Sequence, residues 1–180
     1  MDMTLMDRVL EIDREAQVAR VQAGIYGPAL EEALQREGLT LSHYPQSFEF
    51  STLGGWIAAR GAGHQSNRYG KAEQWLVSAT LATPNGLWKT EGFPATAAGP
   101  RLTDLVAGSE GVLGVITEAE VKLRRVPELK DYRGYIFPEF TVGVAAARAL
   151  MQSETPPAMV RLSDPAETFF LQALHSGGEG

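Results

Sequence analysis

A glycine-rich run that leads directly into an alternating strand pattern places the strongest constraint on the fold of this chain. Gly108, Gly111 and Gly114 fall within seven residues, and residues 115–123 then alternate between two faces. The period of two predicts a strand over 115–123. The glycines before it allow a backbone that lies against a flat ligand, or one that only turns the chain between a helix and a strand. A Rossmann fingerprint has the opposite order, with glycines that follow a strand and open a helix.

The residues before this run predict further strands and helices. The expected elements are a β-hairpin at residues 4–23, a helix at 27–38, a strand at 74–82, a returning strand at 87–90 and a short helix at 102–107. The apolar residues that share one face of the strand at 74–82 are Trp75, Val77, Ala79 and Leu81. Gly27-Pro28 opens the helix because the missing N–H of proline has no partner in a first turn. Asn85-Gly86 is a typical two-residue hairpin turn.

Beyond a linker at residues 126–128, the order of elements restarts. The expected elements are a strand at 132–137, a helix at 140–151, a strand at 158–162 and a helix at 164–174. This alternation is typical of an α/β domain. We therefore expect one domain at residues 1–127 and the beginning of a second at 128–180.

Composition excludes several classes of function. The chain has 180 residues, a net charge of −6, no cysteine and three histidines. The negative charge gives no basic surface for nucleic acid or an anionic membrane. Without cysteine there are no disulfides and no thiolate catalysis, and the histidines lack metal-ligand spacing, so no metal site is expected. No apolar run approaches the roughly 20 residues of a membrane helix, and no signal peptide is visible, so we expect a cytoplasmic protein.

A second segment combines hydroxyls with paired glycines. Ser51-Thr52-Leu53-Gly54-Gly55 precedes an apolar stretch that can begin a helix. Unpaired N–H groups at a helix start, with glycines that allow close approach, suit the pyrophosphate of a nucleotide. A plain capped helix explains the same residues.

Together, the two segments resemble the second half of the FAD-binding domain of the vanillyl-alcohol oxidase family, also called the p-cresol methylhydroxylase type. The resemblance covers residues 4–127. The family's Pro-x-Ser…Ser-Thr-x-Gly-Gly segment is matched by residues 45–55, and its Gly-Ser-Glu-Gly-x-Leu-Gly-Val-Ile-Thr segment by residues 108–117. The resemblance implies an α+β fold, in which a mixed sheet flanked by helices is followed by the start of an α/β substrate domain.

The resemblance also implies non-covalent FAD and a set of cofactor contacts. The residues at the matching positions are Pro45, Gln46, Ser47, Phe48, Glu49, Phe50, Ser51, Thr52, Gly54, Gly55, Ala59, Arg60, Gly61, Ala62, Gly63, Tyr69, Gly70, Glu110, Gly111, Val112, Leu113, Gly114, Val115 and Ile116. Residues 45–55 would line the pyrophosphate, and residues 59–63 and 69–70 would approach the flavin ring. Arg161 either faces the active site, as the resemblance implies, or lies at an exposed edge. The resemblance also implies that the family's main catalytic residues lie outside this chain.

Within the family, the chain looks most like the alkyl-dihydroxyacetonephosphate synthase branch. Trp56 after the glycine pair and the segment from Ala158 to Asp164 favour that branch, whereas Gln46 stands where the branch tends to carry Asp. This likeness implies exchange of an acyl for an alkyl group in ether-lipid synthesis, on a lipid-like substrate. Oxidation of a 2-hydroxy acid or alcohol by the same flavin is the alternative, and a homodimer is left open.

A third hypothesis is a folded fragment with no ligand and no turnover. The family carries an upstream Gly-Gly-Gly-Thr-Ser-type phosphate loop that this sequence does not contain. We expect weak FAD binding by the chain alone, since that loop would supply many of the N–H bonds to the pyrophosphate.

The remaining polar and aromatic residues have simpler interpretations. His64 is expected to be an exposed loop residue. Lys122, Arg124 and Arg125 are expected to form a solvated strand face. The three tryptophans, Trp56, Trp75 and Trp88, are expected to be packed or half-buried.

Overall fold

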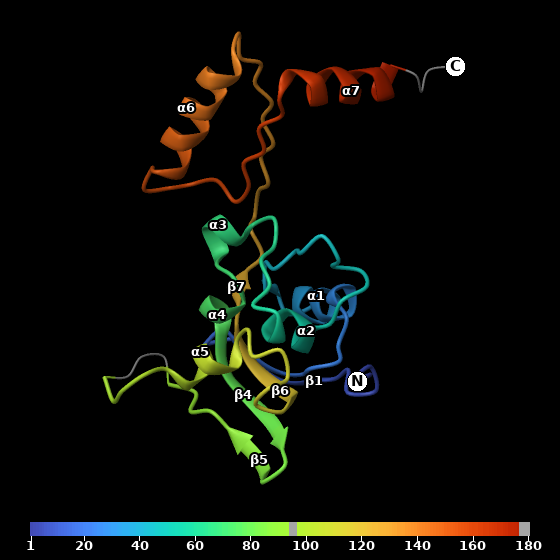
Figure 1. Ribbon diagram of the computed structural model, residues 1–180, viewed down its shortest axis with the longest axis vertical. Helices are drawn as coiled ribbons and strands as arrows, with labels where there is room; N and C mark the ends of the chain where they lie inside the picture. The colour runs from blue at the N-terminus through green and yellow to red at the C-terminus, as the bar shows by residue number, and fades with distance from the viewer. Residues whose placement is uncertain (94–96, 177–180) are drawn as a thin grey trace. The chain divides into compact units, whose positions relative to one another are not determined.

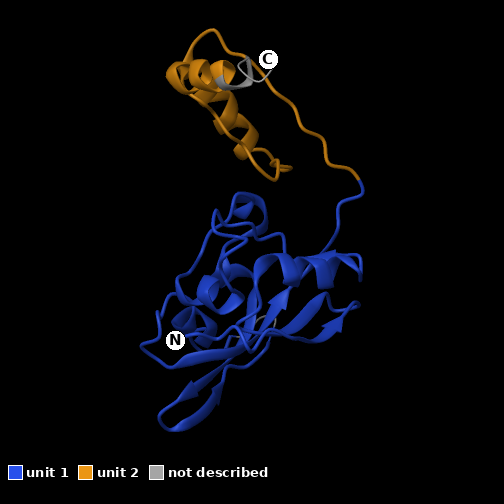
Figure 2. Cartoon of the chain, turned by 90° about the vertical axis from the view of Figure 1, so that its right-hand side faces the viewer, with its two compact units in different colours: residues 1–128 blue, residues 129–180 orange. Residues whose placement is uncertain are grey.

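The computed structural model describes residues 1–93 and 97–176. The chain divides into two compact units, residues 1–128 and residues 129–180 (Figure 2). Among the described residues, no helix has both the length and the apolar character that a bilayer crossing requires.

Unit 1 is built on a five-stranded sheet with the order β1-β2-β6-β4-β5 (Figure 1). Its strands are β1 (Val9–Asp13), β2 (Val18–Gln22), β4 (Leu76–Thr83), β5 (Gly86–Lys89) and β6 (Val115–Lys122). Every neighbouring pair is antiparallel, so the expected mixed sheet is wrong. Short turns join β1 to β2 and β4 to β5, and such turns can only connect antiparallel strands. A separate pair, β3 (Leu39–Thr40) and β7 (Arg124–Arg125), is also antiparallel.

Five helices accompany the sheet in the described part of unit 1. They are α1 (Gly27–Gln35), α2 (Leu53–Ala58), α3 (Ser66–Tyr69), α4 (Ala72–Trp75) and α5 (Leu102–Val106). α1 has proline in its first turn, as predicted, and the chain leaves it through Gly38, whose φ is +72°. Leu30 and Leu34 of α1 and Ile57 of α2 are fully buried, and together with the sheet they form one core.

In β4 and β6, the two strands that carry the core, buried and more accessible residues alternate as the sequence predicts, but in each strand the alternation shifts once by one residue. Ala119 and Val121 of β6 are buried, but so is Ile116, which was expected on the other face. On β4 the buried residues include Leu76 and Ser78, and Trp75 belongs to α4 instead of the strand. The pairing of β4 with β6 is irregular between Leu76 and Ser78 and between Thr80 and Leu81. A bulge of this kind shifts the inward-facing residues by one position, which a strict period of two does not foresee.

The hairpin of β4 and β5 forms as predicted, with its turn one residue earlier. Thr83 pairs with Gly86, so Pro84 and Asn85 make the turn. Gly86 has a φ of +113°, which explains the glycine at the first residue of the returning strand.

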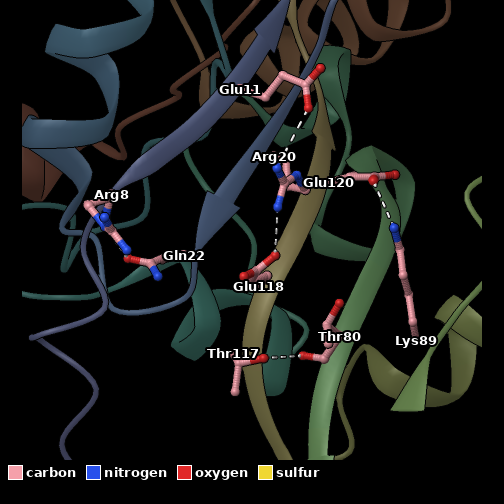
Figure 3. A network of polar contacts seen from close by, with 9 residues as sticks. All are labelled: Arg8, Glu11, Arg20, Gln22, Thr80, Lys89, Thr117, Glu118 and Glu120. Carbon is pink, nitrogen blue, oxygen red and sulfur yellow. Dashed lines mark hydrogen bonds and ion pairs between the residues drawn. The ribbon is translucent and has the colours of Figure 1, made fainter. Parts of the chain in front are cut away.

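The sheet face opposite the core is polar and carries ion pairs (Figure 3). Arg20 lies between Glu118, at 3.2 Å, and Glu11, at 3.7 Å. Lys89 contacts Glu120 at 3.3 Å. Opposite charges thus pair between β1, β2 and β6 and, across β4, between β6 and β5, which stabilises a solvated face.

Unit 2 contains α6 (Phe140–Met151) and α7 (Pro165–Ser176). The expected helices are present, but residues 132–137 and 158–162 form no strand in the described chain. An isolated extended segment has no ladder partner, and two segments without a third cannot make a stable sheet. Phe137 and Leu162 instead approach Gly143 of α6, where an added Cβ would lie 3.1 Å and 2.7 Å from their side-chain carbons.

Candidate functional site

The two glycine-bearing segments, about 50 residues apart in the sequence, are joined by backbone hydrogen bonds. The N–H of Gly108 donates to the carbonyl of Ile57 at 2.9 Å, and the N–H of Glu110 donates to that of Ala58 at 3.1 Å. The C-terminal end of α2 therefore lies directly against the turn that precedes β6. The fold thus places the end of α2 beside residues 108–110, two segments that the sequence assigned to one cofactor site.

The paired glycines of the first segment have different surroundings. A Cβ on Gly54 would lie 2.8 Å from the Cβ of Ala23, and the N–H of Gly54 donates to the Ala23 carbonyl at 2.7 Å. A Cβ on Gly55 would meet only the Oγ1 of Thr52, at the ordinary distance of 3.5 Å. The first backbone bond of α2 runs from Trp56 to Thr52, so the exposed N–H of Gly55 has no acceptor in the described chain. Gly54 serves the packing of α2, whereas Gly55 is open to a ligand.

The hydroxyls of Ser47 and Ser51, which precede α2, are used within the chain. Ser51 donates to the carbonyl of Ser47 at 2.7 Å and accepts from the indole N–H of Trp56 at 2.6 Å. Ser47 in turn donates to Ser51 at 3.0 Å. Phe48 stacks on Trp56 with ring centroids 6.2 Å apart, and Phe50 is 83% exposed. These bonds fix the shape of residues 47–56, so this segment presents backbone groups to a ligand more than free hydroxyls.

The second segment repeats the contrast between glycines. Gly111 has a φ of +88° and nothing within 4 Å of an added Cβ. Gly114 has a φ of +143°, and an added Cβ would lie 2.6 Å from the carbonyl oxygen of Ala82. The strand entry at Gly114 is therefore structural, and Gly111 leaves open space beside the backbone.

Ser109 is a candidate that the residue-by-residue prediction omitted. Its Oγ is buried and has no hydrogen-bond partner among the described residues. A buried hydroxyl without a partner is unusual and often marks a place that a ligand or water completes. The sequence signal was present, since Ser109 stands between the glycine and the glutamate of the second motif.

The segment between the two motifs is held by arginines. The side chain of Arg60 donates to the carbonyls of Ala107 and Asp104, at 3.0 Å and 2.8 Å. Arg124 donates to the carbonyl of Tyr69 at 2.8 Å and lies 5.0 Å from its ring centroid. Arg124 is half-buried, so its expected place on a solvated face is wrong. Its guanidinium fixes the turn at Tyr69 and Gly70, because it combines a charged hydrogen bond with a cation–π contact.

The residues at 61–63 pack against a buried histidine and its neighbour. An added Cβ on Gly63 would lie 2.7 Å from the backbone nitrogen of Tyr44, and one on Gly61 would lie 3.7 Å from Nε2 of His43. His43 is buried between Trp56 and Trp75, with ring centroids 4.9 Å and 5.1 Å away. Burial lowers the pKa of His43 to about 4. His43 is therefore neutral under the segment at physiological pH.

Arg161 belongs to unit 2, whereas His64 and the three tryptophans belong to unit 1. Arg161 is in unit 2, outside any strand, with a side chain 65% exposed and 2.5 Å from Glu167. His64 is exposed, as expected, and Trp56 and Trp75 are buried while Trp88 is half-buried. Within residues 1–93 and 97–176, no three His, Asp or Glu side chains gather as metal ligands would.

The joined segments have the properties of a site for a flat, anionic nucleotide cofactor. Open backbone at Gly55 and Gly111 allows close approach of a ligand. The unpartnered hydroxyl of Ser109 lies at the seam, the place where the backbone of Gly108 and Glu110 bonds to the end of α2. Such an arrangement suits a protein that binds a flavin nucleotide.

Comparison with known proteins assigns the chain to that class. The FAD binding domain family matches residues 1–91, and the chain belongs to this family. The resemblance drawn from the two motifs is therefore confirmed.

The individual relatives support the branch that the sequence favoured. The chain is 44% identical to alkyldihydroxyacetonephosphate synthase of Dictyostelium discoideum over 167 residues. This aligned stretch is 93% of this chain and 27% of that protein. A solved structure of alkyldihydroxyacetonephosphate synthase matches with a TM-score of 0.79 and 44% identity, over 86% of this chain and 28% of that one. A glycolate oxidase subunit of Bacillus subtilis is 32% identical over 161 residues, 88% of this chain and 34% of that protein. The chain resembles part of the synthase and spans about a third or less of the length of these relatives.

Proposed function

We propose that this chain forms part of a non-covalent FAD site, with the pyrophosphate against residues 45–55 and the flavin ring near residues 59–63, 69–70 and 110–116. The observation that carries the proposal is the joining of the two motif segments by backbone bonds, with an open glycine in each segment, Gly55 in one and Gly111 in the other. Membership of the FAD binding domain family supports the choice of cofactor.

The role of the protein in such a site is to bind and orient. When bound, FAD supplies the reactive flavin ring, and the residues of the chain supply position and electrostatics. The N–H of Gly55 is free to donate to a phosphate oxygen. The internal bonds of Ser51 hold residues 47–56 in one shape, so that little conformational freedom is lost on binding.

For the full-length gene product we propose acyl-to-alkyl exchange on an acyl-dihydroxyacetonephosphate, the synthase type of reaction. The 44% identity to a protein of that name, over nearly the whole of this chain, supports this choice. It exceeds the 32% identity to the glycolate oxidase subunit.

Oxidation of a 2-hydroxy acid or alcohol is the second candidate. The glycolate oxidase relative supports it, and Gln46, where the synthase branch tends to carry Asp, weakens the synthase assignment. The two reactions leave different marks on the flavin. Stoichiometric bleaching of bound flavin by a hydroxy acid supports oxidation, and a spectral change with acyl-dihydroxyacetonephosphate supports exchange.

The FAD site is tested by Gly55→Val in the full-length gene product, with flavin content and FAD affinity as readouts. We expect loss of FAD with the fold retained, because the new side chain has room in the protein but fills the space beside the free N–H. Gly54→Val is the matched control. It should lower thermal stability, because its Cβ meets Ala23. Full flavin occupancy in Gly55→Val contradicts the proposed site.

A further inference from the structure

Arg60 occupies a backbone position at which glycine is the usual residue. At the end of α2, the N–H of Arg60 donates to the Ile57 carbonyl (3.1 Å) and the N–H of Gly61 donates to the Trp56 carbonyl (2.7 Å). This pair of bonds is the Schellman motif, and it places Arg60 in the left-handed region with a φ of +52°. A residue with a Cβ is strained there, so another interaction has to favour arginine over glycine.

The guanidinium of Arg60 makes that interaction with the end of α5. Its Nε donates to the carbonyl of Ala107 at 3.0 Å, and its Nη2 donates to the carbonyl of Asp104 at 2.8 Å. Carbonyls in the last turn of a helix lack helical partners and accept such bonds readily. The planar fork of arginine reaches both oxygens at once, which the single ammonium of lysine does not do in the same geometry.

These bonds lie at the seam between the two motif segments. Directly after Ala107, the chain returns to α2 through the N–H groups of Gly108 and Glu110. Glu110 is itself a non-glycine residue in the left-handed region, with a φ of +47°. Strained residues therefore lie on both sides of the seam, a concentration that is typical of functional sites.

We propose that Arg60 is a positioning residue that sets the spacing between residues 51–63 and residues 108–114. Its guanidinium binds the chain's own carbonyls and so presets the backbone on both sides of the flavin nucleotide. This inference rests on the proposed FAD site, and it gives the Arg60 side chain a role other than direct contact with the cofactor.

The test compares Arg60→Gly and Arg60→Lys with wild type in the full-length gene product. Amide hydrogen exchange at Gly108 and Glu110 reports the seam, and FAD titration reports the site. In both variants we expect roughly tenfold faster exchange and roughly tenfold weaker FAD binding, since two charge-assisted bonds are lost or reduced. The thermal midpoint of Arg60→Gly should stay close to wild type, because glycine relieves the backbone strain.

Gln17→Gly is the matched control for that strain. Gln17 also has a left-handed backbone, with a φ of 54°, but it lies in the turn between β1 and β2. It should change neither the exchange at Gly108 and Glu110 nor the affinity for FAD.

Three results would overturn the role of Arg60. If the amides of Gly108 and Glu110 exchange in Arg60→Gly at the wild-type rate, the seam does not depend on the guanidinium. If FAD binding is then weaker while exchange is unchanged, Arg60 is a direct ligand of FAD instead. Wild-type behaviour of Arg60→Lys would likewise exclude the fork. If wild type itself binds no FAD, the proposed function fails, whereas the exchange rates still decide for or against the positioning role.

Discussion

The two units of the chain bury their apolar side chains to very different degrees. In unit 1, Leu81 on β4 and Leu30 on α1 are fully buried in one core. In unit 2, Phe169 and Phe170 of α7 are 74% and 62% exposed, and the only buried residue of α6 is Gly143. Both units carry apolar patterns in the sequence. The difference shows that such a pattern gives a packed element only where another element of the same chain covers its apolar face.

The largest expected effect comes from deleting one apolar side chain in each unit. Leu81→Ala should lower the free energy of unfolding by about 2–5 kcal/mol, because it leaves a cavity in a closed core. Phe170→Ala should change it by less than about 0.5 kcal/mol, since that ring is largely exposed. Denaturant unfolding followed by circular dichroism measures both. Equal losses in the two variants would break the comparison and place unit 2 in a packed state.

This contrast also explains how far the sequence predicts the fold. Short turns and strict alternation foretold β1, β2, β5 and β6, because those signals lie within a few residues of one another. Residues 132–137 have a strand-like composition but no partner, so a local pattern misled. The antiparallel pairing of β2 with β6 joins residues about 100 positions apart, and no local signal specifies it.

The candidate site shows the same limit at the level of single residues. The motifs predicted that residues 51–55 and 108–114 act together, and the backbone bonds of Gly108 and Glu110 place them side by side. The sequence did not distinguish Gly54 from Gly55, since only the position of Ala23 separates their surroundings. It also missed the bonds of Arg60 and Arg124, which reach carbonyls more than 40 positions away.

A second test uses the imidazole of His43, a polar group that is buried in the core of unit 1. His43 is 1% exposed, and both ring nitrogens lack partners among the described residues. Its pKa is lowered from 6.5 to about 4 by burial, so the unfolded chain takes up the proton first as the pH falls. The free energy of unfolding should therefore not depend on His43 titration above pH 6.5. Between pH 6.5 and 4 it should fall by about 3 kcal/mol because of this group.

The control for that decline is His43→Phe, measured by unfolding at several pH values. An apolar ring removes the titration and leaves no unpaired nitrogen, so the slope between pH 6.5 and 4 should flatten. The exposed His64 replaced by Phe should keep the wild-type slope. An unchanged slope in His43→Phe would mean that other groups control the acid sensitivity.

A third test compares two neighbouring arginines at the end of unit 1. Arg124→Ala should cost about 1–2 kcal/mol, because it removes a charged bond to the Tyr69 carbonyl and the contact with its ring. Arg125→Ala, in the same two-residue strand but exposed, should cost less than about 0.5 kcal/mol. The flavin spectrum of the full-length gene product should shift only in Arg124→Ala if the turn at Tyr69 approaches the ring. Equal free energies of unfolding for Arg124→Ala and Arg125→Ala would mean that Arg124 is a solvated surface residue, as the sequence predicted.

The smallest expected effect on stability belongs to the arginine of unit 2. The Arg161 side chain is 65% exposed, and its ion pair with Glu167 joins two solvated groups. Water and salt screen such a pair, so Arg161→Ala should leave the unfolding midpoint unchanged. If Arg161 faces the substrate of the full-length gene product, turnover should nevertheless fall steeply, and Arg161→Lys should restore part of it.

Glu167→Gln breaks the same ion pair and separates the two explanations. A loss of turnover shared by Arg161→Ala and Glu167→Gln points to the pair as a local support, whereas a loss confined to Arg161→Ala points to contact with substrate. Wild-type kinetics in Arg161→Ala would leave Arg161 as an exposed residue, and unit 2 would then contribute no functional group from that segment.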